Sequence, residues 1–281
     1  MIPSFDAADY RASVEEAADH IRAESDAIPT TALILGTGLG GLKDDIHVSV
    51  RLPYASIPGF PTSTTSMHEG ELLVGTLNGA PVMAMNGRMH LYEGYTAHQV
   101  AFPIRVMGVL GVEHLLLSNA AGGMDPHFDE GDLMLITDHI NEQGTNPLVG
   151  PNIDDWGPRF PDMSEPYDAE LRAMARSEAL KREIHLYQGV YLAVLGPMLE
   201  TKAEYRYMRD LGAEVVGMNT VPEVIAAHHM GIRCLAVSVI TDICLPDALE
   251  PVDIESIMAA AADARPRLGR LMAGVVKQLS S

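Results

Sequence analysis

The sequence predicts an α/β fold in which one central mixed β-sheet is flanked by helices, as a single domain over residues 1–281. Three observations lead to this prediction. Short apolar runs of strand character alternate with longer stretches of helical apolar spacing along the whole chain. Apolar residues make up 47% of the 281 residues, enough for a sizeable core. The sequence contains no internal repeat and no linker, so one domain is expected.

The balance of charge restricts the partners that the chain is expected to bind. The sequence has 38 acidic and 19 basic residues, a formal net charge of −19, which argues against nucleic-acid binding by general electrostatics. The two cysteines, Cys234 and Cys244, fit no metal-ligand spacing and favour a reducing compartment. Apolar runs are too short for a membrane span, and the acidic N-terminus is unlike a signal peptide. We therefore expect a cytoplasmic protein with no membrane partner and no metal site.

The first expected elements are a helix and a strand. A capping-box pattern at Ser13–Glu16 predicts a helix that begins just after Ser13 and runs into the twenties. The apolar run Thr31–Leu35 predicts a buried strand.

A glycine-rich segment follows this strand directly. Gly36, Gly38 and Gly41 match the G-x-G-x-x-G pattern of dinucleotide-binding folds. The acidic residue that such folds need about twenty positions later is absent from Pro53–Phe60, so NAD binding is disfavoured. Two interpretations stay open: a loop whose N–H groups and Thr37 hydroxyl face an anion, or a tight turn that needs glycine for its backbone freedom.

The next expected elements are a loop and a β-hairpin. Residues 53–70 are rich in proline, glycine, serine and threonine, which predicts a loop. Apolar runs at Glu71–Leu77 and Pro81–Met85 flank Asn78-Gly79, the dipeptide typical of a tight hairpin turn.

The stretch after this hairpin combines a cation, an imidazole and a phenol. If the second strand continues through Tyr92, then Arg88, His90 and Tyr92 share one face, while Met89 and Leu91 point into the core. A guanidinium offers a planar fork of donors that fits a phosphate or a carboxylate, and a histidine beside it can donate, accept or titrate. The alternative is an ordinary half-exposed strand with solvated polar side chains.

The later elements continue the alternation. We expect helices over Thr96–Gly111 and Tyr167–Arg182, two helices that begin with the capping boxes Thr201–Glu204 and Thr220–Glu223, and a final helix over Val252–Leu279 interrupted by Pro266. We expect strands over Val112–Leu117, which leads into the small residues Ser118–Gly123, and over Asp132–Thr137, His185–Val194, Ala213–Gly217 and Arg233–Thr241. A long irregular segment is expected over Gln143–Tyr167. Single polar or functional residues fall at the strand ends, where open α/β sheets bind ligands: Thr37, Arg88, Asn119, Met218 and Asp242.

Taken together, these segments resemble the trimeric purine nucleoside phosphorylase family, whose close relatives are the methylthioadenosine phosphorylases. The resemblance runs from about Thr31 to the last helix. It is carried by Gly36–Gly40, His68, Gly87–Tyr95, Ser118–Gly123, Asp138–Asn141, Gly196-Pro197 with Glu200-Thr201, and Gly217–Glu223.

The resemblance implies a nucleoside phosphorylase-type fold, a homotrimer, and an enzyme in which phosphate displaces a purine from C1′ of a nucleoside. No metal or organic cofactor is implied, because inorganic phosphate is a co-substrate. Phosphate would be held by Thr37, His68, Arg88, His90, Asn219 and the backbone of Ala120. The nucleoside would be bound by Tyr92, Asn119, Leu199, Glu200, Met218, Thr241, Asp242, Ile254 and, from the neighbouring subunit, Phe160. The catalytic residues would be His90, Glu93 and Asp242.

The base preference is left open by departures from the family pattern. Asp242 replaces an asparagine of the 6-oxopurine enzymes, and an ionised carboxylate, which only accepts hydrogen bonds, suits a 6-amino group. Ile254 stands about where those enzymes often have a histidine, and it would tolerate a 5′-methylthio group. Glu200, in contrast, is the carboxylate expected for N1–H of a 6-oxopurine. We therefore expect 6-oxopurine nucleosides to be favoured, with adenosine or methylthioadenosine as the alternative.

Overall fold

The computed structural model describes residues 5–36, 40–62, 70–251 and 253–280. Within these ranges the strands are β1 Thr31–Leu35, β2 Ile46–Pro53, β3 Glu71–Leu77, β4 Ala80–Asn86, β5 His114–Gly123, β6 Leu133–Asn141, β7 Tyr187–Ala193, β8 Val215–Gly217 and β9 Arg233–Ile243. The α-helices are α1 Ala7–Glu24, α2 Ala97–Leu110, α3 Ala169–Lys181, α4 Lys202–Asp210, α5 Val221–His229 and α6 Ile254–Leu279, and short 3₁₀-helices cover η1 Gly40–Asp45, η2 Tyr54–Ser56 and η3 Leu91–Glu93.

The strands form one mixed sheet in the order β2-β3-β4-β1-β5-β8-β7-β6-β9. β1 lies parallel to both β4 and β5, whereas β3 lies antiparallel to β2 and β4. An additional parallel pairing of β5 with β9 closes β5, β8, β7, β6 and β9 into a ring. The predicted fold class, a mixed sheet flanked by helices, is confirmed.

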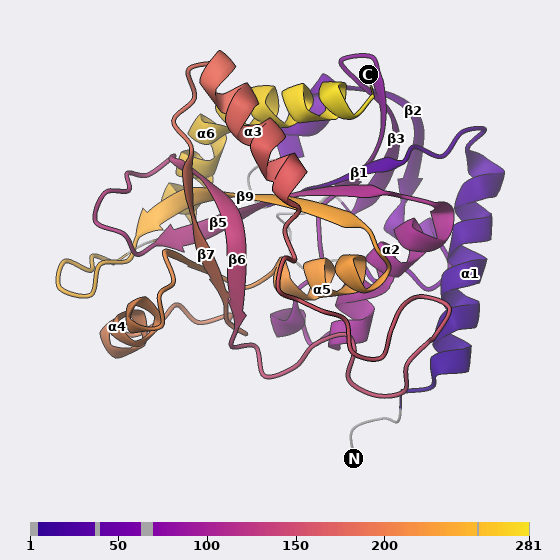
Figure 1. Cartoon of the computed structure of the whole chain (residues 1–281), viewed down its shortest axis with the longest axis horizontal. Coiled ribbons are helices and arrows are strands. Elements are labelled where there is room, and N and C mark those ends of the chain that lie inside the picture. Colours follow the sequence, from indigo (N-terminus) through magenta and orange to yellow (C-terminus); the bar gives the residue numbers. More distant parts are fainter. Residues whose placement is uncertain (1–4, 37–39, 63–69, 252, 281) are drawn as a thin grey trace.

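Helices cover the two faces of the sheet (Figure 1). In β1, Ala32 and Ile34 join the core that includes α1, α2 and α5, whereas Leu33 and Leu35 join the core that includes α3 and α6. This period of two follows from the alternation of side chains along a strand. Burial on both faces explains why the strand reads as an uninterrupted apolar run.

The predicted start of the first helix is wrong, and one strand was not predicted. The first helix begins at Ala7 rather than after Ser13, because the Asp6 carboxylate caps it by accepting from the N–H groups of Ala8 and Asp9. A strand that the sequence did not indicate, β2, lies at the sheet edge, where its outward polar side chains interrupt the apolar pattern.

The strand expected to run through Tyr92 ends at Asn86. Gly87 has φ 111°, a backbone conformation that favours glycine, and Leu91–Glu93 then forms a 3₁₀ turn. Strand alternation therefore does not place Arg88, His90 and Tyr92 together.

The expected strand boundaries at Leu117 and Thr137 are also wrong. β5 continues through the small residues 118–123, because they pair with β9, and β6 continues to Asn141 beside β7. The irregular segment after β6 is confirmed, since no helix or strand occurs between Asn141 and Ala169. In the described parts of the chain, no helix is both long and apolar enough to cross a lipid bilayer.

Candidate active site

A cavity of about 320 Å³ lies where β5, β8 and β9 end. Its walls also include the segment after β4, the turn before α4, and the start of α6. The lining residues are His90, Tyr92, Ala120, Ala121, Gly122, Pro197, Leu199, Glu200, Tyr205, Val216, Gly217, Met218, Asn219, Thr241, Asp242, Cys244, Ile254 and Ile257. Strand ends of an α/β sheet are the usual place for a ligand site, so the cavity lies where the sequence predicted one.

On one wall of the cavity, two neighbouring side chains hold the carboxylate of Asp242. The Thr241 hydroxyl donates to Oδ1 at 2.9 Å, and the Cys244 thiol donates to Oδ2 at 3.0 Å. Burial, followed by the nearby Asp242 carboxylate, raises the pKa of the Cys244 thiol, so this group keeps the proton that it donates. A Cβ atom at Gly122 would lie 2.6 Å from the thiol sulfur, and the pair therefore needs glycine there.

A second carboxylate, Glu200, lines the same cavity just before the N-cap residue of α4, Thr201. Burial raises the pKa of Glu200, and the negative charge of Asp242 raises it further, while an interaction with the Tyr205 hydroxyl acts in the opposite direction. Tyr205 also interacts with Cys244. Glu200 and Asp242 are thus two acid groups in one electrostatic environment, and each affects the ionisation of groups on the same wall.

His90 lines the cavity, and contacts with Glu93 and Tyr92 fix the orientation of its imidazole ring. Its Nδ1 lies 2.9 Å from Oε1 of Glu93, and the same oxygen accepts the His90 backbone N–H at 2.9 Å. The Tyr92 ring stacks on the imidazole, with centroids 4.6 Å apart and planes 15° apart. Because both His90 and Glu93 are almost fully buried, the carboxylate selects the imidazole tautomer that carries a proton on Nδ1.

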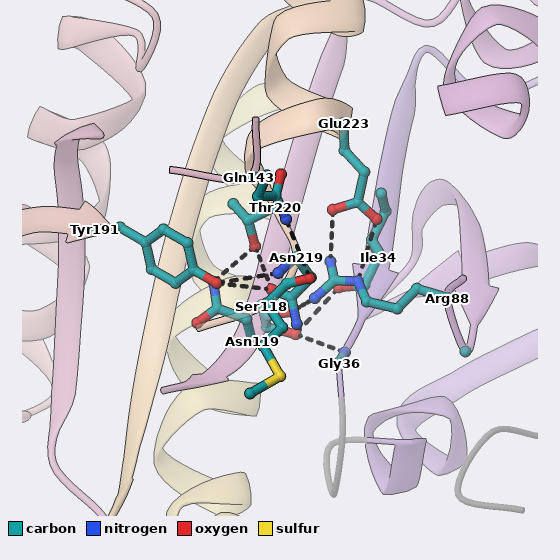
Figure 2. A network of polar contacts seen from close by, with 12 residues as sticks. Ile34, Gly36, Arg88, Ser118, Asn119, Gln143, Tyr191, Asn219, Thr220 and Glu223 are labelled. Carbon is teal, nitrogen blue, oxygen red and sulfur yellow. Dashed lines mark hydrogen bonds and ion pairs between the residues drawn. The ribbon is translucent and has the colours of Figure 1, made fainter. Parts of the chain in front are cut away.

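Arg88 is completely buried, and its charge is offset by a carboxylate from α5 (Figure 2). Nε donates to Oε1 of Glu223 at 3.1 Å, and Nη1 donates to the Ser118 carbonyl at 2.9 Å. Nη2 lies 3.1 Å from Oε2 of Glu223 without the geometry of a hydrogen bond, and it has no hydrogen-bond partner among the described residues. The guanidinium is therefore rigidly held and retains donor capacity.

A second buried network surrounds Asn219. This residue stands between β8 and α5 in the chain and lines the cavity. Its side-chain oxygen accepts from the hydroxyls of Tyr191 at 3.2 Å and Thr220 at 2.8 Å. The Thr220 hydroxyl in turn accepts from the amide of Asn119 at 2.9 Å (Figure 2). A residue of β5 is thereby tied to the start of α5.

The structure brings most of the predicted site residues to one cavity. Its lining includes His90, Tyr92, Ala120, Leu199, Glu200, Met218, Asn219, Thr241, Asp242 and Ile254. Arg88 and Asn119 are fully buried outside the lining, and Glu93 lies behind His90. Phe160 is 86% exposed and lines a different hollow. Thr37 and His68 fall outside the described residues.

Sequence reasoning missed four residues that hold the site together: Tyr191, Tyr205, Glu223 and Cys244. One of them carried a usable signal, because Cys244 lies two positions after Asp242, the spacing that puts side chains on one face of an extended chain. The sequence pattern predicts that Glu223 is part of a capping box. Instead, the side chain of Thr220 makes no capping bond and Glu223 pairs with Arg88.

Comparisons with known proteins agree with this geometry. The family model described as Phosphorylase superfamily matches residues 30–277. Purine nucleoside phosphorylase 1 of Bacillus subtilis (strain 168) is 47% identical over 265 residues, which are 94% of this chain and 98% of the relative. Purine nucleoside phosphorylase of Bos taurus is 46% identical over 233 residues, 81% of each chain.

Solved structures extend the likeness to three dimensions. A Schistosoma purine nucleoside phosphorylase in complex with hypoxanthine has a TM-score of 0.91 at 39% identity and covers 96% of this chain and 98% of that chain. The Schistosoma mansoni enzyme in complex with adenosine has the same TM-score, identity and coverage. The chain belongs to the purine nucleoside phosphorylases of the Phosphorylase superfamily.

Proposed function

We propose that this enzyme cleaves purine ribo- and deoxyribonucleosides with inorganic phosphate, and that it favours 6-oxopurines. One observation carries the proposal: a single cavity joins two carboxylates, Glu200 and Asp242, to the donor groups of His90, Ala120 and Asn219. A carboxylate wall suits the edge of a purine, whereas a cluster of donors suits an oxyanion. The proposal assigns no metal or organic cofactor.

The chemistry requires two partners to be held on opposite faces of a sugar. An oxygen of phosphate forms a bond to C1′ while the bond from C1′ to N9 breaks, and the bonding electrons leave with the purine, which takes up a proton. Positive charge develops on the sugar and negative charge on the base. The protein therefore contributes by positioning both partners and stabilising these charges.

The phosphate would be bound on the side of the cavity that is next to Arg88. In a chain of net charge −19, an anion site depends on local donors. Arg88 keeps an Nη2 group without a hydrogen-bond partner among the described residues, and the neighbouring lining offers His90, Asn219 and the backbone of Ala120. We propose that Thr37 and His68 complete this site, and that Glu93 acts by fixing the His90 ring.

The base would be bound on the side of Glu200 and Asp242. An ionised Glu200 can accept the N1–H that a 6-oxopurine has and an adenine lacks, which supports a preference for inosine and guanosine. Leu199, 46% exposed at the cavity, would pack on the base. Tyr92 and Met218, which also line the cavity, would contact the ribose.

A second candidate is phosphorolysis of adenosine or 5′-methylthioadenosine. Two observations favour it. Asp242 is held by two donors and presents a carboxyl group where an acceptor would suit a 6-amino group. Ile254 lines the cavity with an apolar side chain that is 59% exposed, a surface compatible with a methylthio group.

A substrate panel tests both candidates. Purified enzyme is assayed for release of free base from inosine, guanosine, adenosine and 5′-methylthioadenosine, each with and without saturating phosphate. We expect phosphate-dependent release that is fastest for the two 6-oxopurine nucleosides. Faster turnover of adenosine or methylthioadenosine would replace the first candidate by the second, and release that is independent of phosphate would refute both.

We also propose that the enzyme is a homotrimer in which Phe160 reaches the cavity of the neighbouring subunit. The ring is 86% exposed and lines a different hollow from the cavity, while Leu199 and Ile254, which line the cavity, are also exposed apolar side chains. Burying such surfaces against one another would be favourable.

Sedimentation and one matched pair of variants test this assembly. Phe160→Ala should raise the KM for the nucleoside, whereas Leu180→Ala, which removes a similarly exposed apolar side chain on α3, should not. A monomer with full activity, or equal effects of the two substitutions, would contradict the proposed role of Phe160.

A further inference from the structure

The chain makes a strained turn where it enters α5. Thr220 has φ 65° and ψ −52°, a conformation that β-branched residues rarely adopt. The Val221 N–H donates to the Asn219 carbonyl at 2.7 Å, which closes a three-residue γ-turn of the rare kind with positive φ. Thr220 is fully buried. Strain of this kind persists only where the surroundings hold it, and it concentrates at functional sites.

Two buried hydroxyl groups hold this turn, and the direction of their hydrogen bonds can be deduced (Figure 2). The backbone N–H of Asn219 can only donate, so the Tyr191 oxygen accepts it at 3.3 Å. The side-chain amide of Asn119 donates to the Thr220 hydroxyl at 2.9 Å. Each hydroxyl oxygen therefore accepts from an N–H group and has its own proton left to donate.

Both hydroxyl protons are directed to the same atom, Oδ1 of Asn219. The distances are 3.2 Å from Tyr191 and 2.8 Å from Thr220. A carboxamide oxygen has two lone pairs, and these two bonds occupy both. Oδ1 is consequently the end of the carboxamide that faces the protein. Nδ2, with its two N–H donors, is the other end, and Asn219 lines the cavity.

We infer that Tyr191 and Thr220 are positioning residues that hold the Asn219 carboxamide with its NH₂ group toward the bound phosphate. This inference rests on the proposed function, because it deepens the assignment of the phosphate site. An unheld carboxamide could rotate and present its oxygen, which would repel the anion. The two hydroxyls remove that alternative before phosphate arrives.

The surroundings of Tyr191 support the same role. Its ring is completely buried, and burial raises the pKa of the phenol well above its ordinary value, so the proton donated to Oδ1 is retained. A Cβ atom at Gly217 would lie 2.3 Å from the Tyr191 oxygen. The hydroxyl thus reaches Asn219 only because position 217 carries no side chain.

Steady-state kinetics with both substrates varied test this inference. Tyr191→Phe and Thr220→Val each delete one hydroxyl and should raise the KM for phosphate about three- to tenfold, the range for one neutral hydrogen bond. The KM for the nucleoside should change much less. Thr220→Ser keeps the hydroxyl and should restore a KM for phosphate close to that of the wild type.

A double-mutant cycle separates positioning from general damage. If both hydroxyls act through Asn219, adding Tyr191→Phe or Thr220→Val to Asn219→Ala should raise the KM for phosphate no further. Tyr205→Phe is the matched control at the base wall and should raise the KM for the nucleoside rather than for phosphate.

The outcomes distinguish this inference from the proposed function. A wild-type enzyme without phosphate-dependent turnover would refute the proposed function itself. Normal wild-type turnover, together with equal increases of both KM values in Tyr191→Phe and Thr220→Val or with fully additive effects on Asn219→Ala, would overturn only the positioning role. Thermal unfolding of each variant identifies any that misfolds, and the Thr220→Val and Thr220→Ser pair then decides the result.

Discussion

Asp242 is the residue whose chemistry bears most directly on base preference. Thr241 and Cys244 donate to its two oxygens, and this arrangement presents a carboxyl group that accepts from a 6-amino group when it is ionised. Asparagine has nearly the same shape but adds an N–H donor, which suits a 6-oxo group.

We therefore predict that Asp242→Asn raises the ratio of kcat/KM for inosine to that for adenosine. The expected change is about tenfold or more, because a hydrogen bond to a charged group contributes about 1.5–3 kcal/mol. Cys244→Ser, which keeps a donor to Asp242, should leave the ratio close to that of the wild type. A ratio that Asp242→Asn does not change would remove Asp242 from base selection.

Glu200 should make the use of inosine sensitive to acid. Burial, with the charge of Asp242, raises the pKa of Glu200 above its ordinary value of 4.5. Below that raised pKa the group is protonated and cannot accept N1–H, so kcat/KM for inosine should fall as the pH drops, with a midpoint above 4.5. Phosphate also titrates, so the pH profile of the wild type must be compared with that of Glu200→Gln. This variant should have lower activity, and its kcat/KM for inosine should no longer show the fall at low pH that is due to protonation of Glu200. If Glu200→Gln showed the same fall of kcat/KM at low pH as the wild type, Glu200 would not be the group that accepts N1–H.

Among the structural elements, the starts of α4 and α5 carry the same capping-box sequence pattern, but only α4 forms the capping box. Thr201–Glu204 forms the predicted capping box, with bonds of 2.7 and 3.3 Å at the start of α4. Thr220–Glu223 has the same pattern but does not, because Glu223 pairs with Arg88, 135 positions away in the sequence. Local sequence predicts where both helices begin. It cannot predict that a distant buried cation competes for the second carboxylate.

This difference predicts unequal effects on stability. Glu223→Gln leaves the guanidinium of Arg88 buried without a counter-charge and should lower the free energy of unfolding by about 3–5 kcal/mol. Glu204→Gln should change it little, since glutamine can make the same capping bond. Urea unfolding without phosphate measures both. Equal losses would show that the Arg88–Glu223 ion pair does not act as a buried pair.

The irregular segment between β6 and α3 is attached to α5 through a neutral histidine. Nδ1 of His229 lies 2.9 Å from Nη1 of Arg105, and Nε2 lies 3.2 Å from Oδ1 of Asn152. Nδ1 must accept from the guanidinium, so Nε2 carries the proton. Burial, followed by the charge of Arg105, lowers the pKa of His229 to about 4.

Stability should consequently fall in mild acid. The unfolded chain binds a proton at this histidine near pH 6.5, whereas the folded chain does not until about 4. The contribution of the neutral His229 to the free energy of unfolding is complete above pH 6.5 and is lost as the pH falls toward 4. Burial also lowers the pKa of His98, His114 and His139, so these histidines act with the same sign. The measurement is therefore the difference in free energy of unfolding between wild type and His229→Leu, in urea at pH 7 and pH 5. That difference should shrink at pH 5, and a constant difference would refute the assignment.

For the whole molecule, the sequence predicted the class of fold and the strand ends at which the cavity lies, but not the contacts that hold the residues around that cavity. β1 and the hairpin of β3 and β4 follow from local apolar pattern and turn chemistry. The ring that β9 closes with β5 depends on pairings between strands more than 100 positions apart, and so does the contact of Asn119 with Thr220. Such contacts result from the global packing, which no local pattern encodes.

The central claim concerns the molecule as a whole: one cavity holds a purine nucleoside against phosphate and exchanges the base for it. Phosphorus-31 NMR of the reaction with inosine, with hypoxanthine measured in parallel, tests this claim most directly. We predict that phosphate disappears in equimolar amounts with the base that is released, and that a single sugar 1-phosphate appears with inverted configuration at C1′. Base release without consumption of phosphate, or a free sugar as the first product, would contradict it.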